Sequence, residues 1–203
     1  ALVREVEAER GSNHPVLAHG DLRVIDGEGK VARPSFWAMK QIDPACSQSL
    51  RRTLIHASVV GCTTTMNRAL VNACLPIPHE AVMHDWWISL IAAARGTVVF
   101  DPVPRIDYRI HGNNVSNPRE ASASAAMGQA NYRAVMQQKI AVRARQAGAL
   151  ADRLDRAAPA QARLAQQFAQ LPQIGFVARR IAILRHRFLF PGIWRNLALA
   201  LAS

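Results

Sequence analysis

The sequence predicts a mixed α/β fold that is followed by a helical and strongly basic C-terminal region. Up to residue 117, short β-branched and aliphatic runs bounded by turn residues alternate with helical patterns. From Pro118 onward, the apolar residues recur at helical spacing. The charge divides near the same place: residues 1–120 carry 13 Lys and Arg against 12 Asp and Glu, whereas residues 121–203 carry 12 against 2. We therefore expect two domains, residues 1–117 and residues 118–203.

The composition favours a globular protein over a disulfide-rich, zinc-binding or membrane-spanning one. Half of the 203 residues are hydrophobic, which is typical of a globular chain with a sizeable core. The three cysteines, Cys46, Cys62 and Cys74, form no Cys-x-x-Cys pair. Their number and spacing argue against a disulfide framework and a zinc site, and they favour a reducing cytoplasm. No uncharged apolar run reaches the ~18 residues of a membrane span. We expect a cytoplasmic protein.

The individual elements follow from local patterns. Apolar spacing of three and four residues predicts helices, and β-branched runs between turn residues predict strands. The expected helices cover residues 1–10, 46–56, 68–74 and 85–95. The expected strands cover residues 16–18, 22–25, 62–66, 97–100 and, at a sheet edge, 106–110. In the helical region we expect breaks at Gly148, Pro159, Pro172 and Pro191-Gly192.

The most informative stretch is His84-Asp85-Trp86-Trp87, which follows a Pro-rich loop and precedes an apolar run. Asp85 is expected near the N-terminal cap of the helix that this run predicts. Indole rings have broad flat faces on which sugars and other ligands pack, so Trp86 and Trp87 are candidates for a binding surface. A capping Asp followed by two buried tryptophans would explain the same residues.

Three segments occur in an order that points to a known family: Gly61-Cys62-Thr63, then His84 to Trp87, then Tyr108-Arg109-Ile110-His111-Gly112. This ordered set resembles the family-2 glycosyltransferases, especially their bacterial rhamnosyltransferase-like branch, over roughly residues 16–115. The resemblance implies a GT-A fold. It also implies transfer of a sugar from a nucleotide-sugar to a glycan or lipid-linked acceptor, with inversion of the anomeric carbon. Such an enzyme would build surface polysaccharide, and dTDP-rhamnose is one candidate donor.

The chain departs from that family at its start. Members begin with a βαβ nucleotide-binding half that ends in an acidic Asp-x-Asp motif, whereas this sequence opens at Ala1 and resembles the family only from Pro15 onward. We therefore expect the C-terminal, acceptor-side part of a GT-A-type mixed sheet, without the donor-binding half and inactive as an isolated fragment. The resemblance implies a divalent metal, Mg²⁺ or Mn²⁺, whose main acidic ligands lie in the missing half.

The same resemblance suggests roles for individual residues. Asp85 matches the general base, which takes the proton of the acceptor hydroxyl. The expected acceptor contacts are His84, Trp86 and Trp87. The expected contacts to the donor or its diphosphate are Gly61, Thr63, Arg109 and His111, with His111 also a candidate metal ligand. An exposed loop His, a surface strand Arg and a turn His would explain the same positions without a site.

Two other functions fit parts of the sequence. His84-Asp85 is also compatible with an HD-type metal phosphohydrolase, which would need further ligands from His56, His79 or His111. The surrounding strand patterns disfavour that class, whose ligands come from several helices. The basic C-terminal region would suit a non-enzymatic binder of membranes or nucleic acid, but it has few aromatic residues and no recognition motif. We expect no nucleic-acid partner.

The segment from Arg179 to Arg195 interleaves Arg with bulky apolar residues. This pattern suits an interfacial helix on an anionic bilayer, which would place the protein peripherally on the inner face of the plasma membrane. A helix that packs its apolar stripe on the rest of the protein and exposes its Arg residues to water has the same pattern.

Overall fold

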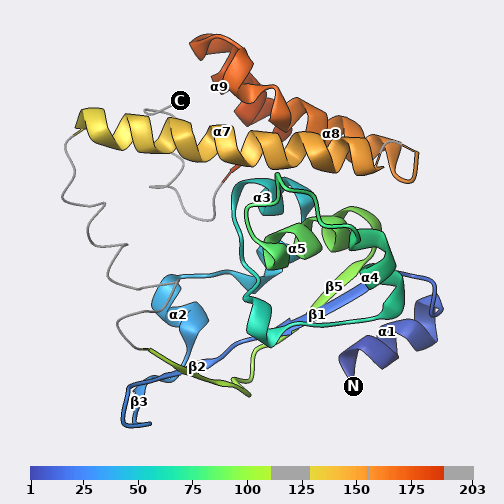
Figure 1. The fold of residues 1–203 in the computed structure, drawn as a ribbon, viewed down its shortest axis with the longest axis vertical. Helices are drawn as coiled ribbons and strands as arrows, with labels where there is room; N and C mark the ends of the chain where they lie inside the picture. The colour runs from blue at the N-terminus through green and yellow to red at the C-terminus, as the bar shows by residue number, and fades with distance from the viewer. Residues whose placement is uncertain (111–128, 155, 190–203) are drawn as a thin grey trace.

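The computed structural model describes residues 1–110, 129–154 and 156–189. It confirms the predicted class as a mixed α/β part followed by a helical part (Figure 1). Two small mixed sheets and their helices occupy residues 1–110, and three α-helices account for most of residues 129–189. The predicted domain boundary between residues 117 and 118 lies outside the described residues.

The first sheet has the strand order β4-β1-β5. The central strand β1 (Val16–Gly20) pairs in parallel with β5 (Thr97–Asp101) along its whole length, and antiparallel with the short β4 (Thr65–Met66). Helix α1 (Leu2–Arg10) contacts β1 and β5. Gly96 precedes β5, and Pro15 precedes its partner strand β1. The two residues lie so close together that a Cβ on Gly96 would collide with the carbonyl of Pro15. Glycine at this position therefore lets the parallel pairing begin.

The second sheet has the strand order β3-β2-β6 and lies at one end of the molecule (Figure 1). Strand β2 (Arg23–Ile25) pairs antiparallel with β3 (Val31–Arg33) and in parallel with the edge strand β6 (Asp107–Arg109). The Asp26 carboxylate accepts two backbone N–H groups and so closes the β2–β3 turn. A small core lies between this sheet and α2 (Phe36–Lys40), formed by Leu22, Val24, Phe36 and Trp37.

Helix α5 (His84–Arg95) lies in the middle of the α/β part, and nine of its 12 residues are buried. It packs against α3 (Leu50–Ile55), α4 (Arg68–Cys74) and the two parallel strands of the first sheet. A helix that is apolar on nearly all sides is stable only when other elements surround it. Its burial therefore explains why so many short helices gather around it.

The helices α7 (Gln129–Leu154), α8 (Pro159–Ala169) and α9 (Phe176–His186) form a layer over α3 and α5 (Figure 1). One hydrophobic cluster runs through both parts of the molecule and includes Leu17, Trp87, Leu150, Phe168 and Phe188. The helical part therefore shares its core with the α/β part. Within the described residues, none of the helices combines the length and the apolarity needed to cross a lipid bilayer.

The strand predicted over residues 62–66 is wrong for most of its length. Gly61–Thr63 form a 3-10 turn, and only Thr65–Met66 are extended. The Thr63 hydroxyl donates to the carbonyl of Val60, and the Thr64 hydroxyl donates to that of Gly61. Local bonds of this kind compete with a strand ladder, which explains why a run rich in threonine turns here.

The break predicted at Gly148 is also wrong, because Gly148 lies inside α7. A glycine in a helix interior costs only about 1 kcal/mol relative to Ala, and the packing of α7 against α8 outweighs this cost. The break at Pro159 is confirmed, since α8 begins there. Pro172 lies in a 3-10 turn that separates α8 from α9, and Pro191-Gly192 lie outside the described residues.

The shared core predicts cooperative unfolding of both parts. Leu150 of α7 is fully buried in the common cluster, so Leu150→Ala should lower the free energy of unfolding by about 2–5 kcal/mol. Urea unfolding followed by tryptophan fluorescence and by far-UV circular dichroism should give coincident transitions. The matched control Leu75→Ala removes an exposed side chain and should cost less than about 0.5 kcal/mol. Two separated transitions would contradict the shared core.

Candidate functional site

The carboxylate of Asp85 lies in the first turn of α5 and is only 9% exposed. Its Oδ2 accepts the backbone N–H of Gly61 at 3.0 Å, and its Oδ1 accepts the N–H of Trp86 at 2.7 Å. Asp85 lies near the N-terminal cap of α5, as expected, but it is not the N-cap residue itself. The N-cap residue is Met83, whose side chain makes no capping bond. Asp85 instead accepts the free N–H of Trp86 in the first turn through one oxygen and reaches across to the turn at Gly61 with the other.

Gly61 is the point at which two of the predicted segments meet. A Cβ on Gly61 would lie 3.2 Å from both the Asp85 Oδ2 and the His84 Nε2, which is tighter than an ordinary contact. Cys62 next to Gly61 is exposed, but nearby atoms partly desolvate its thiol, and this, together with the Asp85 charge, raises the pKa of the thiol. The structure therefore brings together Gly61, His84 and Asp85, which the sequence analysis named from segments 24 residues apart.

The two tryptophans of the motif lie in the core. The indole N–H of Trp86 donates to the carbonyl of Thr53 at 2.6 Å, and that of Trp87 donates to the carbonyl of Cys74 at 3.0 Å. The guanidinium groups of Arg143 and Arg153, both from α7, lie over the two rings. The structure thus gives both indoles a packing role, as in the buried-tryptophan interpretation. Contact with an acceptor stays a prediction for both.

A groove of about 800 Å³ opens at the carboxyl ends of β1 and β5. Ligands of open α/β sheets bind at this edge of the sheet. Thr63 borders the groove and Asp85 does not, and the turn Gly61–Thr63 contacts the Asp85 carboxylate at its other end. The charged and polar side chains of the groove include Arg4, His19, Asp21, Arg68, Asp101 and Arg105. No sequence motif indicated these residues, although His19 directly follows one predicted strand and Asp21 directly precedes the next.

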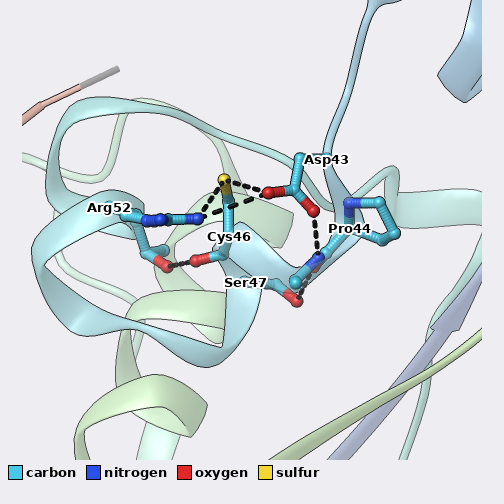
Figure 2. Close-up of polar contacts among 7 residues, drawn as sticks. Asp43, Pro44, Cys46, Ser47 and Arg52 are labelled. Carbon is cyan, nitrogen blue, oxygen red and sulfur yellow. Dashed lines mark hydrogen bonds and ion pairs between the residues drawn. The ribbon is translucent and has the colours of Figure 1, made fainter. Parts of the chain in front are cut away.

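His19 is a buried, neutral histidine on the wall of this groove. The Ser47 hydroxyl donates to the carbonyl of Pro44 at 2.7 Å, so its oxygen accepts the His19 Nε2–H at 2.9 Å (Figure 2 shows the turn that carries Ser47). This assignment leaves Nδ1 as the unprotonated nitrogen, and it is buried without a hydrogen-bond partner. Burial lowers the pKa of His19 to about 4. The ring is therefore uncharged at neutral pH.

The turn behind His19 is held by Asp43 and Arg52 (Figure 2). One Asp43 oxygen caps the 3-10 helix Pro44–Gln48 through the N–H of Ala45, and the other accepts from Arg52 at 3.3 Å. The thiol of Cys46 lies between these two charged groups, and burial is the main reason for its raised pKa. Because this network fixes the 3-10 helix, it also fixes the Ser47 oxygen that orients His19.

Two acidic residues of the groove already have several partners. Asp21 accepts the hydroxyl of Ser35 and the N–H groups of Leu22, Phe36 and Trp37, so it fixes the start of α2. Asp101 accepts Nε of Arg105 at 2.8 Å and the N–H of Val103, and these bonds keep its pKa below the usual range. Both carboxylates therefore shape the groove before any ligand is considered.

Arg109, a further predicted contact, is not part of the Asp85 cluster. Arg109 ends β6 in the second sheet and donates to the carbonyl of Gly27 at 3.1 Å, and it does not border the groove. His111 lies outside the described residues. In the part of the chain that the structure describes, no three His, Cys, Asp or Glu side chains come close enough to hold a metal ion.

The chain was also compared with known proteins. No protein-family model, no curated protein and no solved structure matches it.

The neutral state of His19 predicts a pH-dependent stability. Its pKa is lower in the folded chain than in the unfolded chain, so the unfolded state binds more protons between about pH 6.5 and pH 4. Above pH 6.5 His19 is neutral in both states and the free energy of unfolding has its full value. As the pH falls from about 6.5 to about 4, the free energy of unfolding should fall by up to about 3 kcal/mol. Urea unfolding at several pH values should show a weaker pH dependence for His19→Gln than for the wild type. The exposed control His79→Gln should keep the wild-type dependence.

The close approach at Gly61 predicts that a single methyl group disturbs the site. Gly61→Ala should push the Asp85 carboxylate and the His84 ring away from the turn, at a cost of about 1–3 kcal/mol in the free energy of unfolding. A matched control is Gly27→Ala, since a Cβ at Gly27 meets nothing within 4 Å. The control should be neutral or slightly stabilising, because alanine restricts the unfolded chain. Equal urea midpoints for the two variants would show that Gly61 does not hold the cluster.

Proposed function

We propose that the chain is the acceptor-side part of an inverting glycosyltransferase with a GT-A-type fold, in which Asp85 is the general base. The donor would be a nucleotide-sugar, and the acceptor a glycan or a lipid-linked glycan of the cell envelope. The observation that supports this most is the convergence of Gly61, His84 and Asp85 beside a groove at the carboxyl ends of parallel strands. The mixed α/β sheet and the ordered sequence segments are compatible with the same proposal.

The chemistry of inversion needs a base on the face of the sugar opposite the leaving group. The acceptor oxygen forms a bond to the anomeric carbon while the bond to the diphosphate breaks, and the base takes the hydroxyl proton. Each oxygen of the Asp85 carboxylate accepts one backbone N–H and keeps further acceptor capacity. The two bonds orient the carboxylate without using all of its lone pairs, as this role requires.

His84 would contribute to acceptor binding. Its side chain is exposed, and its Nε2 lies beside Gly61, close to the Asp85 oxygen. An imidazole in this position can exchange hydrogen bonds with a sugar hydroxyl. We therefore assign His84 to positioning of the acceptor, and the proton transfer to Asp85.

The groove would receive the donor. Its volume of about 800 Å³ is within the usual range of small-molecule sites, which is about 300–1,000 Å³. Arg4 and Arg68 border it and could offset the negative charge of a diphosphate. Thr63 belongs both to the groove and to the turn that contacts Asp85, so the donor would lie next to the turn that holds the base.

The test is Asp85→Asn in the full polypeptide that the gene encodes. Asn cannot take a proton, so turnover should fall by about 10²–10⁴-fold with little change in the KM for the donor. Its single oxygen can accept the N–H of Gly61 or that of Trp86 but not both, so the free energy of unfolding should also fall by about 1–3 kcal/mol. The assay measures release of nucleoside diphosphate in the presence of acceptor. The matched control is Asp107→Asn, which removes an exposed carboxylate paired with Arg23 in the second sheet and should leave turnover unchanged.

Thermal melting of the same variants separates the two roles of Asp85. A variant with normal turnover would refute the proposed base. A variant that loses turnover and also melts many degrees lower would show that Asp85 acts by holding the turn at Gly61. The proposal requires that turnover is lost in a folded variant whose melting temperature falls only by the few degrees that one lost hydrogen bond explains.

A further inference from the structure

Helix α9 has apolar side chains on two opposite faces. Ile183 on the inner face is buried in the common core, together with Phe188 just beyond the helix. Packing within the chain therefore explains the apolar residues of the inner face. The outer face carries three large apolar side chains that are more than half exposed: Val177 67%, Ile181 60% and Leu184 67%. Phe176, at the start of the helix, is 52% exposed. Packing among the described residues gives no reason for these exposed apolar side chains.

The outer residues form a continuous stripe. At ~100° per residue, Val177, Ile181 and Leu184 fall within about 60° of the helix circumference, on the side away from Ile183. Arg180 and Arg185 fall on the two edges of this arc, and the guanidinium of Arg180 lies 3.8 Å from the ring centre of Phe176. The arrangement is an apolar stripe with basic borders.

Hydrogen bonds fix the direction in which the stripe faces. On the inner side of α9, Arg179 donates to the carbonyls of Leu171, Pro172 and Ile174, which precede the helix. At the other end, Arg51 from α3 donates to the carbonyl of His186 at 2.8 Å. Both ends of α9 are therefore attached to the rest of the protein, and the stripe stays on the outside.

The charge around the stripe has one sign. From residue 156 to the end of the chain, the sequence contains seven Arg and no Asp or Glu. Arg185 and Arg187 are exposed at the C-terminal end of α9, next to the stripe. A partner for this surface must accept aliphatic side chains and offer negative charge beside them.

We propose that the outer face of α9 binds an anionic lipid bilayer, with Val177, Ile181 and Leu184 in the boundary between headgroups and acyl chains. Arg185 and Arg187 would contact lipid phosphates. A helix of 11 residues is ~16 Å long, and its stripe is smaller than the ~800 Å² per partner of a stable protein interface. Nucleic acid would use the Arg residues but not the aliphatic ones. The inference does not depend on the proposed glycosyl transfer.

The experiment is vesicle flotation of the full chain with phosphatidylglycerol and with phosphatidylcholine. The wild type should prefer phosphatidylglycerol by about tenfold or more, and this preference should shrink at high salt. The triple variant Val177→Ser, Ile181→Ser and Leu184→Ser should lose about tenfold or more in binding. The variant Arg185→Gln with Arg187→Gln should bind both lipids alike. The matched control for the triple variant replaces three exposed aliphatic residues elsewhere: Val31→Ser, Leu75→Ser and Ile77→Ser.

Several outcomes would overturn the proposal. Equal binding of the wild type to both lipids, or no binding to either, would refute an anionic bilayer as the partner. Undiminished binding of the triple serine variant would show that the stripe is not used, provided that its circular dichroism matches the wild type. Analytical ultracentrifugation tests whether a second copy of the chain binds the stripe instead. A wild-type dimer that the triple variant abolishes, without vesicle binding, would assign the stripe to a second copy of the chain.

Discussion

The burial of the two indole rings of α5 is the interaction on which the rest of the structure depends. Trp86 and Trp87 lie in the core between the first sheet and the C-terminal helices, and each indole N–H donates to a backbone carbonyl. An unpaired buried N–H would cost about 1–3 kcal/mol, so these bonds make the burial of such large rings favourable. Arg143 and Arg153 of α7 lie over the same rings, and thus the helical part is attached to α5.

The same constraint produces the candidate site. Because Trp86 and Trp87 fix the first turn of α5, the preceding residue Asp85 has a fixed position as well. The carboxylate then contacts the turn at Gly61, where only a missing side chain leaves enough room. A polar group with few conformations requires little reorganisation when a ligand binds, which is the general advantage of building a site on a rigid element.

The groove and the outer face of α9 are two surfaces that differ in charge and polarity. The groove beside β1 and β5 has a mixed charge, with acidic residues that are already bonded and a histidine that burial keeps neutral. The outer face of α9 is aliphatic and basic, with no acidic residue in the sequence after residue 155. The first surface offers many directional contacts and suits a polar small molecule. The second offers area and positive charge, which suit a lipid surface better.

The sequence by itself determined the class of the fold and most of its elements. Local patterns were sufficient for the α/β part, for the helical region and for the helix that starts with His84-Asp85, because spacing and caps act over a few residues. They failed at residues 62–66, where threonine hydroxyls bond to nearby carbonyls, and at Gly148, where packing outweighs helix propensity. The order of the sequence segments also indicated Gly61, His84 and Asp85 as candidate site residues, and the structure brings these three together.

Only the tertiary structure decided which of these residues meet and what they face. It gave the tryptophans a packing role, brought Gly61 against the Asp85 carboxylate and added His19, which no motif had indicated. It also showed that the basic helix α9 buries one apolar face in the core and exposes other apolar side chains, a difference that its sequence pattern does not contain. The physical reason is that burial and long-range hydrogen bonds depend on residues far apart in the chain, which a local pattern does not contain.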